Sequence, residues 1–202
     1  MFIATFSTYK YIGIHTGKLE LCASHGICTK EALQKLADAG VTTYHHNLES
    51  SRRFYPNVCT SHTYDDRVNT IKNAKAVGLN VCSGGIFGLG ETIEDRIDMA
   101  LDLRELEIRS VPINVLTPIP GTPFENNEEV NPFEILKTIS IYRFILPKSF
   151  LRYCGGRIKL GKHAKTGLRC GINSALTGNF LTTTGTTIET DKKMIKELGY
   201  EI

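Results

Sequence analysis

Apolar and polar positions recur in a fixed order along the chain: a short apolar segment, a polar or glycine-rich break, and a helical segment with one apolar face. The apolar segments predict strands at residues 19–23, 41–48, 79–83, 111–116, 150–153 and 176–182. Strands that alternate with helices favour parallel pairing in one sheet. The pattern therefore predicts an α/β fold.

Capping residues mark the predicted helix boundaries. Helices are expected to begin after Thr29, Thr63, Thr92 and Asn131 and at Asp191, and to end near Gly40, Gly78, Pro147 and Gly199. Asp66, three residues after Thr63, resembles the second half of a capping box. The apolar stripe of that helix consists of Val68, Ile71, Ala74 and Val77. In the helix after Thr92, the expected buried side consists of Ile93, Ile97, Ala100 and Leu101.

The order of elements also narrows the fold. No GxGxxG loop follows the first predicted strand, which argues against an open nucleotide-binding sheet. Polar residues at the carboxyl ends of successive strands are typical of a (β/α) barrel, whose active site lies on that face. A closed barrel of this kind has eight strands, whereas the pattern gives about six. We therefore expect an incomplete TIM-type (β/α) barrel.

One predicted strand carries unusually polar side chains. In the segment Tyr44–Glu49, strand alternation puts His45, Asn47 and Glu49 on one face. A strand covered by helices normally reads as a continuous apolar run, and buried polar groups need partners. A polar ligand would satisfy these three side chains, and so would hydrogen bonds to neighbouring strands or loops. The pattern alone leaves both interpretations open.

Four further residues stand at or near strand ends: Cys22, Cys82, Asn114 and Arg152. A cysteine in a strand is more often a small core residue than a ligand. An arginine that faces a barrel interior more often binds a carboxylate or a phosphate than a metal. Asn114, a lone amide in an apolar strand, is accounted for equally by an interior hydrogen bond. Taken singly, these residues indicate little.

Composition excludes several classes of protein. The chain has 202 residues, 41% of them hydrophobic and 22% charged, with a net charge of +3 from scattered residues. This balance gives no reason to expect a nucleic-acid or membrane partner. Residues 1–18 resemble neither a secretory signal nor a mitochondrial presequence, so we expect a reducing compartment, the cytoplasm. There, six cysteines without a CxxC spacing are ligands or buried thiols rather than disulfides or a zinc ribbon.

The string from Cys82 to Thr92, CSGGIFGLGET, is the most specific motif, and its glycines would let a ligand approach the backbone closely. With it stand the stretches YHHNLE at 44–49, FYPN at 54–57, TYDDR at 63–67, SVPIN at 110–114, GTP at 121–123 and residues 175–183. From about residue 19 to residue 202, the sequence resembles the biotin synthase family. Gly84, Ile86, Gly88 and Glu91 also fit the GxIxGxxE pattern of the radical S-adenosylmethionine (SAM) superfamily.

The resemblance implies a sulfurtransferase that inserts sulfur into dethiobiotin, with SAM, a [4Fe-4S] cluster and an auxiliary [2Fe-2S] cluster as cofactors. It also implies an electron donor such as flavodoxin or ferredoxin, and a homodimer. Residues 19–202 would be a partial radical-SAM barrel, its strands corresponding to family strands 3–8, with a C-terminal biotin- and thiamin-synthesis-associated region. Residues 1–18 resemble no part of the family. The matching location in a eukaryote would be the mitochondrial matrix.

Carried over by position, three sets of residues take roles from the resemblance. The [2Fe-2S] cluster would be held by Cys22, Cys82 and Arg152, from alternate strands that fill one layer of such a barrel. SAM would be bound by Asn47, Glu49, Arg67, Ile86 and Val115, with Glu49 in place of the aspartate of many relatives. Dethiobiotin would be bound by His45, Asn114, Thr182 and Thr183.

The sequence departs from the family in one decisive respect. It contains no CxxxCxxC motif, the loop that ligates the [4Fe-4S] cluster, and no counterpart of the second strand, which supplies another cysteine to the auxiliary cluster. Cys28, Cys59, Cys154 and Cys170 are treated as incidental thiols. We therefore expect an N-terminally truncated chain that is inactive alone. The alternatives are a non-catalytic binding module that retains a dethiobiotin or [2Fe-2S] pocket, and a different ring-forming radical SAM enzyme, against which Asn114 and the glycine-rich string argue.

Overall fold

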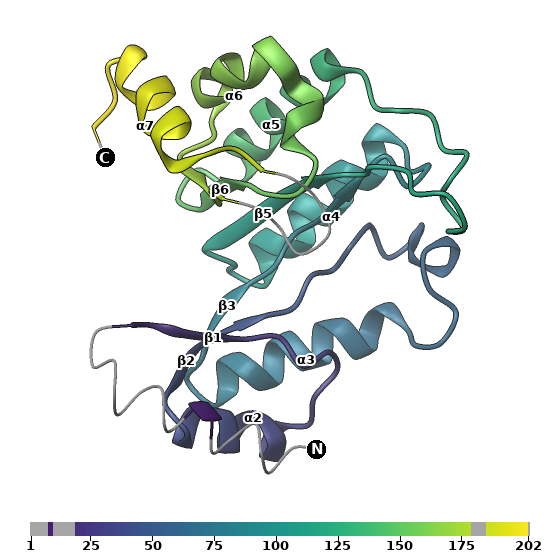
Figure 1. Ribbon diagram of the computed structural model, residues 1–202. Helices are drawn as coiled ribbons and strands as arrows, with labels where there is room; N and C mark the ends of the chain where they lie inside the picture. Colours follow the sequence, from purple (N-terminus) through teal and green to yellow (C-terminus); the bar gives the residue numbers. More distant parts are fainter. Residues whose placement is uncertain (1–7, 10–18, 179–184, 202) are drawn as a thin grey trace.

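The computed structural model, which describes residues 8–9, 19–178 and 185–201, contains one twisted sheet with helices along one side (Figure 1). The strands are β1 (Leu21–Ala23), β2 (Val41–His45), β3 (Asn80–Cys82), β4 (Gly85–Phe87), β5 (Ser110–Val115), β6 (Phe150–Tyr153) and β7 (Ser174–Ala175). Their order is β1-β2-β3-β5-β6-β7, and β4 also pairs with β5. Every pairing is parallel.

Strands β3 and β4 follow each other in the chain, separated by Ser83 and Gly84, and both pair with β5. They therefore count as one interrupted strand of the sheet. The sheet then has six strand positions, which confirms the predicted α/β half-barrel.

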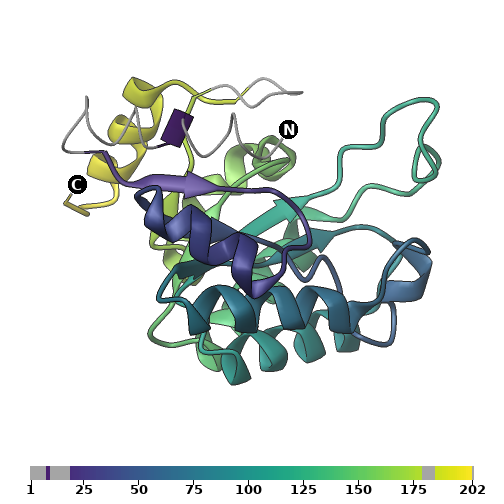
Figure 2. The same ribbon diagram turned by 90° about the horizontal axis from the view of Figure 1, so that it is seen from below.

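Residues 19–178 and 185–201 contain six helices and two 3₁₀ segments, of which α7 follows the last described strand. They are α2 (Lys30–Asp38), η1 (Tyr55–Asn57), α3 (Tyr64–Ala76), α4 (Ile93–Glu105), α5 (Pro132–Ile145), η2 (Arg157–His163), α6 (Ala164–Cys170) and α7 (Ile188–Glu197). Contacts run between α2 and α3, between α4 and α5, and between α5 and α6. Figure 2 shows α2, α3 and α4 along the same side of the sheet. Among the described residues, no helix has the length and apolar character needed to cross a membrane.

The predicted caps explain where these helices begin. Thr29 accepts a hydrogen bond from Ala32 N at the start of α2, and Thr63 and Asp66 form a complete capping box on α3. Thr92 forms a second capping box, with Asp95, on α4. The last helix differs from the prediction: α7 begins at Ile188 rather than at Asp191, because Thr187 caps it by accepting a bond from Thr190 N.

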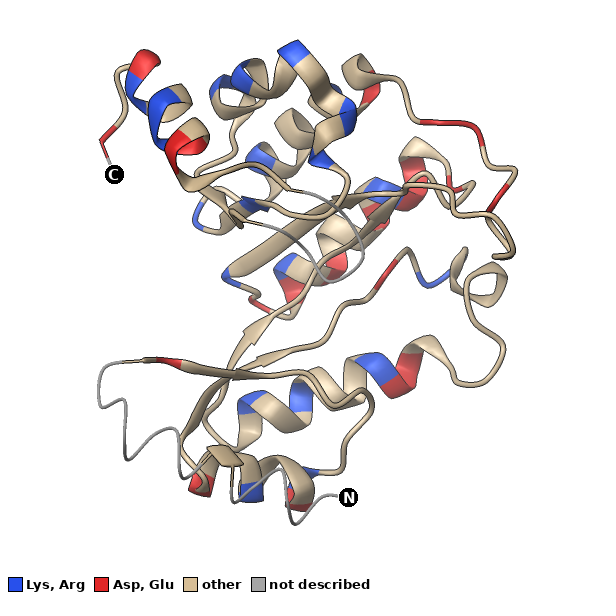
Figure 3. Cartoon of the chain, viewed as in Figure 1, with Lys and Arg blue, Asp and Glu red and all other residues tan. Residues whose placement is uncertain are grey.

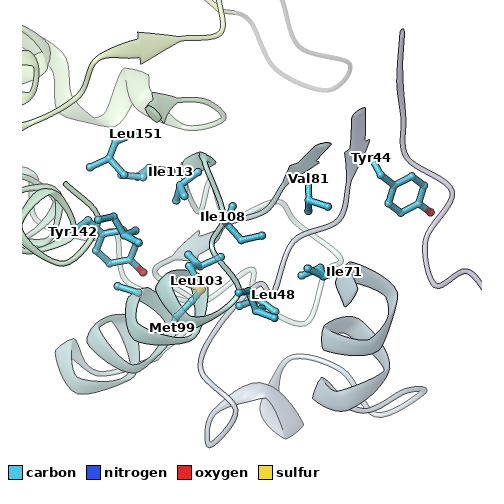
Figure 4. Packing of buried hydrophobic residues seen from close by; sticks show 14 of the residues in the cluster. Tyr44, Leu48, Ile71, Val81, Met99, Leu103, Ile108, Ile113, Tyr142 and Leu151 are labelled. Atoms are coloured by element: carbon cyan, nitrogen blue, oxygen red, sulfur yellow. The ribbon is translucent and has the colours of Figure 1, made fainter. Parts of the chain in front are cut away.

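Figure 4 shows the hydrophobic core between the sheet and the helices, where Val81, Ile113 and Leu151 of the strands face Ile71, Met99 and Leu103 of the helices. The stripe predicted for α3 is confirmed at Val68, Ile71 and Ala74. The side predicted for α4 is wrong in part, because Leu101 is 37% exposed. Met99, Ala100 and Leu103 pack inward instead, alongside Asp95 and Arg96, whose charges are paired.

Two other predictions need correction. The last strand of the described part is Ser174–Ala175, which ends before the predicted range of 176–182; residues 179–182 of that range lie outside the described part. The strand predicted at 41–48 ends at His45, and Glu49 forms an isolated parallel bridge with Gly85. The segments η2 and α6 were not predicted, because their sequence is rich in lysine and glycine and lacks an apolar period.

Candidate functional site

The site is built on the face of the sheet opposite the helices, which we call the polar face. Strand register determines which side chains share it, because paired residues in adjacent parallel strands point to the same side. Cys22 is paired with Thr43, His45 with Cys82, and Cys82 with Ser110. Two residues beyond Ser110, Pro112 is paired with Arg152. The two cysteines and the arginine therefore face the same side.

Arg152 is the only lysine, arginine, aspartate or glutamate in the seven described strands. Figure 3 shows the same contrast: the charges lie mainly on helices and loops. Among the described residues, Arg152 has no hydrogen bond and no ion pair, and its charge helps to hold the pKa of His45 below its usual value, after the larger effect of burial. A partly buried guanidinium without a protein partner is suited to an anionic ligand.

The two thiols differ in exposure. Cys22 is exposed, whereas Cys82 is buried and its Sγ accepts a hydrogen bond from the Ser110 hydroxyl at 3.4 Å. Partial desolvation by its neighbours raises the pKa of the Cys22 thiol, the nearby Cys82 adds to this effect, and Arg152 opposes it. The three groups are thus close enough to influence one another electrostatically.

A cavity of about 330 Å³ opens beside these residues. It is lined by Ser24, Gly26, Ile27, His45, His46, Asn47, Glu49, His62 and Arg67. Four residues predicted from the sequence, His45, Asn47, Glu49 and Arg67, therefore line one pocket.

Arg67, from α3, forms several contacts along one wall of the cavity. Its guanidinium donates to the main-chain oxygen of Asn47 at 2.8 Å and to the Tyr55 hydroxyl, and it lies 3.6 Å from a Glu49 carboxylate oxygen. It also lies 3.4 Å from Nε2 of His62. The Arg67 side chain thereby connects α3 to the segment that follows β2.

Glu49 combines burial with an unusual backbone conformation. Its φ is +71°, a left-handed value that is uncommon for a residue other than glycine. Burial raises the pKa of its carboxyl group, while Arg67 and the Asn47 amide act against this. The remaining lone pairs of a half-buried carboxylate are suited to hydroxyl donors from a ligand.

Sequence reasoning missed His46 and His62 as cavity residues. His46 is 4% exposed, and its Nε2 has no hydrogen-bond partner within the described part of the chain. Buried polar atoms usually have such a partner, so this nitrogen is suited to a hydrogen bond from a ligand. Burial and the charge of Arg67 lower the pKa of His46 to about 4. His62 also approaches the thiol of Cys59, at 3.5 Å. The alternation rule had assigned His46 to the core side, which hid it.

Asn114 lies on the polar face and bridges two strands. Its amide nitrogen donates to Gly85 O at 3.1 Å, and its amide oxygen accepts from Gly155 N at 3.0 Å. Ile86 is paired with it and is half-buried. The amide retains one N–H and one lone pair for a ligand.

Of the remaining predicted residues, the structure describes Val115 alone, and it is not on this face. Val115 belongs to the hydrophobic core, is 6% exposed and pairs with Phe87. Thr182 and Thr183 lie outside the described residues. Their assignments stay predictions.

Two glycines hold the backbone of the site close together. A Cβ on Gly84 would lie 2.0 Å from Pro112 O, and one on Gly85 would lie 2.6 Å from Glu49 O. The break between β3 and β4 therefore has no room for any side chain.

The residues of the polar face can be compared with the ligands that an iron–sulfur cluster needs. No group of three or more His, Cys, Asp or Glu side chains in them is placed to hold a metal ion. Two thiols and an unpaired guanidinium on one face fit part of the ligand set of an iron–sulfur cluster with two irons. The sequence has no CxxxCxxC, so its residues do not fit the [4Fe-4S] cluster. The cavity, with an imidazole nitrogen that has no described partner and a half-buried carboxylate, fits a polar ligand such as SAM.

Comparisons with known proteins show which sequences this chain resembles. Residues 6–103 match the profile described as Radical SAM superfamily, and residues 112–201 match the Biotin and Thiamin Synthesis associated domain. The chain is 94% identical over 194 residues to a biotin synthase of Fusobacterium nucleatum, covering 96% of this chain and 54% of the relative. It is 58% identical to one of Campylobacter hominis, covering 95% of this chain and 59% of the relative. The chain thus spans between half and three fifths of the length of these relatives.

Solved structures show the same fold. Methylornithine synthase matches with a TM-score of 0.79 at 21% identity, over 98% of this chain and 63% of that one. The hydrogenase maturase HydG matches with a TM-score of 0.80 at 17% identity, over 98% of this chain and 49% of that one. At these identities the likeness concerns the architecture alone.

Proposed function

Because the chain belongs to the biotin synthase family, we propose that its residues serve the insertion of sulfur into dethiobiotin. The observation that carries the proposal is the polar face, on which Cys22, Cys82 and Arg152 share a side with Asn114. Parallel sheets covered by helices do not need such residues for folding. The simplest explanation for these polar residues is that they bind a ligand.

In this proposal, the cavity binds SAM and the neighbouring polar face binds dethiobiotin. Asn47 and Glu49 bind SAM, the Glu49 carboxylate accepting hydrogen bonds from the ribose hydroxyls. Arg67 pairs with the SAM carboxylate, and Ile86 contributes apolar contact. Asn114 and His45 bind the ureido ring, for which the free N–H and lone pair of the Asn114 amide are suited. SAM and its reducing cluster would supply the radical chemistry, and the auxiliary cluster would supply the sulfur.

The same proposal predicts that this chain alone does not catalyse the reaction. Thiolates are the usual iron–sulfur ligands, and the chain has no CxxxCxxC to hold a [4Fe-4S] cluster. Alone, it would act as a binding module with a partial [2Fe-2S] site. An electron donor such as flavodoxin or ferredoxin, a homodimer and a cytoplasmic location complete the proposal; the bacterial relatives support the last of these.

Anaerobic reconstitution with ferrous iron and sulfide tests the ligand set. Cys22→Ala and Cys82→Ala should each lower the affinity of the chain for iron by about tenfold or more, whereas Cys170→Ala on α6 should not. Bound iron and visible absorbance after desalting are the readouts, and no biotin is expected from the reconstituted chain. Retention of the full absorbance by both variants would contradict the assignment.

A further inference from the structure

The loop between η1 and α3 holds a thiol and an imidazole side by side. Cys59 Sγ lies 3.3 Å from the Ser61 hydroxyl and 3.5 Å from Nδ1 of His62, and these two partners lie 3.0 Å from each other. Cys59 is partly exposed, so small molecules in solution can reach its sulfur. The loop therefore presents a thiol surrounded by polar groups.

Arg67 determines the direction in which these hydrogen bonds run. A guanidinium has donors only, so the contact at 3.4 Å between Arg67 and His62 makes the imidazole Nε2 an acceptor. In the neutral imidazole, the hydrogen is then on Nδ1. Nδ1–H donates to the Ser61 hydroxyl, which is left to donate to Cys59 Sγ. The chain of donors thus starts at Arg67 and ends at the sulfur.

Such a set of donors stabilises a thiolate more than a thiol. The hydrogen bond from Ser61 lowers the pKa of Cys59, and the main-chain N–H groups of Ser61 and His62 and the Tyr55 hydroxyl add to this effect. At Cys154, by contrast, burial raises the pKa to about 12. The cysteines of this chain therefore differ in the ease with which they ionise.

We propose that Cys59 is a site of covalent modification, the thiol at which this chain reacts first with small disulfides and alkylating electrophiles. With a disulfide, the Cys59 thiolate attacks one sulfur; a new S–S bond forms as the old one breaks, and the other half leaves as a thiolate. The Cys59 sulfur is oxidised and the departing sulfur is reduced, so the reaction needs no further oxidant.

The modification site adjoins the cavity. His62 lines the cavity and contacts Arg67, which lines it as well. His46, 4% exposed, contributes to the same cavity an Nε2 atom that has no partner among the described residues. An adduct on Cys59 would therefore be attached next to the side chain of His62, at the wall of a cavity that is suited to a polar ligand.

The competing interpretation is that Cys59 is an ordinary, partly exposed thiol. Cys170, on α6, provides a matched control, because it has the same intermediate exposure. An ordinary thiol reacts no faster in the folded chain than in the chain unfolded by urea, where every thiol is accessible. A thiol that the fold activates reacts faster in the folded chain.

The experiment treats the reduced, metal-free chain with iodoacetamide at pH 7, in buffer and in urea, and follows each cysteine by peptide mass spectrometry. Each rate is divided by that of N-acetylcysteine in the same solvent. Cys59 should react about threefold or more faster in the folded chain than in urea, whereas Cys170 should not.

Three variants test the cause of the activation. Ser61→Ala and His62→Phe should each lower the rate at Cys59 toward its value in urea, because each removes a donor from the group around the sulfur. Thr60→Ala, in the same loop, is the control and should leave the rate unchanged. Circular dichroism checks that the variants are folded, and Ser61→Ala decides alone if His62→Phe unfolds.

Two results would overturn the proposal. One is a rate at Cys59 that is no higher in the folded chain than in urea, or lower than the rate at Cys170. The other is a fast Cys59 whose rate the folded variants leave unchanged, because the neighbouring donors would then not be the cause. Neither result bears on the ligands proposed for the polar face, since Cys59 is not among them.

Discussion

The two faces of the sheet are made by the same strands but are built differently. On the helix-covered face, Tyr44, Val111 and Leu151 are completely buried. On the polar face, His45, Asn114 and Arg152 stay partly exposed. A single strand such as β6 contributes to both, with Leu151 and Tyr153 on one side and Arg152 on the other.

The difference separates the requirements of folding from those of ligand binding. A parallel sheet between two layers of helices reads as continuous apolar strands, and only one face of this sheet follows that rule. The apolar face supplies the hydrophobic stabilisation, whereas the polar face carries groups that do not need to be there for packing. Substitutions on the two faces should therefore have different consequences.

The largest effect is expected where a charge interrupts the helix-covered side. Arg96 and Glu91, 5% and 9% exposed, form an ion pair at 2.7 Å beside the Phe87 ring. Arg96→Met would leave the Glu91 carboxylate buried without its partner and should lower the free energy of unfolding by about 3 to 5 kcal/mol. Urea denaturation followed by circular dichroism measures this.

The double variant Glu91→Gln/Arg96→Met is the control for that measurement. It removes the buried charge together with its partner and should recover a part of the lost stability. If the double variant is less stable than Arg96→Met, the cost comes from packing rather than from the unpaired carboxylate.

A matched pair of isoleucines sharpens the comparison between the faces. Ile113, 3% exposed, packs on the helix side, whereas Ile86 is half-buried and pairs with Asn114 on the polar face. Ile113→Ala should cost about 2 to 5 kcal/mol of unfolding free energy, and Ile86→Ala about half as much. Equal losses in urea denaturation would mean that the polar face is packed as tightly as the core.

The third expected effect is a dependence on pH that originates at the cavity. Burial lowers the pKa of His46 to about 4 in the folded chain, against 6.5 when unfolded. The unfolded chain therefore binds more protons between these values, and stability should fall by about 2 to 3 kcal/mol as the pH drops from 6.5 to 4. Above pH 6.5, this contribution is constant.

Urea denaturation of His46→Gln and wild type at several pH values isolates the contribution of His46 to stability. The carboxyl groups are the same in both chains, so their contributions cancel in the comparison. The wild-type chain should lose more stability on acidification than the variant. His163→Gln, in η2, serves as the control for replacing a histidine by glutamine. If the stability of His46→Gln and of wild type changes with pH in parallel, His46 accepts a proton as readily in the folded chain as in the unfolded chain.

The sequence predicts the architecture well where local chemistry decides it. Thr63 with Asp66, and Thr92, cap helices as predicted, because capping depends on residues a few positions apart. The exposure of Leu101 was not predictable, since it depends on the buried Arg96, whose partner Glu91 lies outside the helix. Long-range pairing overrides a local apolar count.

The candidate site was predictable to a similar extent. Alternation correctly grouped His45, Asn47 and Glu49, and all three line the cavity. The same rule put His46 on the opposite side, but β2 ends at His45, and His46 also lines the cavity. His62 gives no signal in the sequence, because it reaches the cavity from a loop that only the tertiary structure brings there. The roles of individual residues toward ligands came from the family resemblance.

The close approach of backbone at Gly84 and Gly85 has a consequence for selection experiments. A library that randomises these two codons would return glycine under a screen for soluble expression, since any Cβ would strike Pro112 or Glu49. It would return glycine equally under a screen for ligand capture. Enrichment at these positions cannot tell the two selective pressures apart, whereas enrichment at Asn114 or Arg152 can.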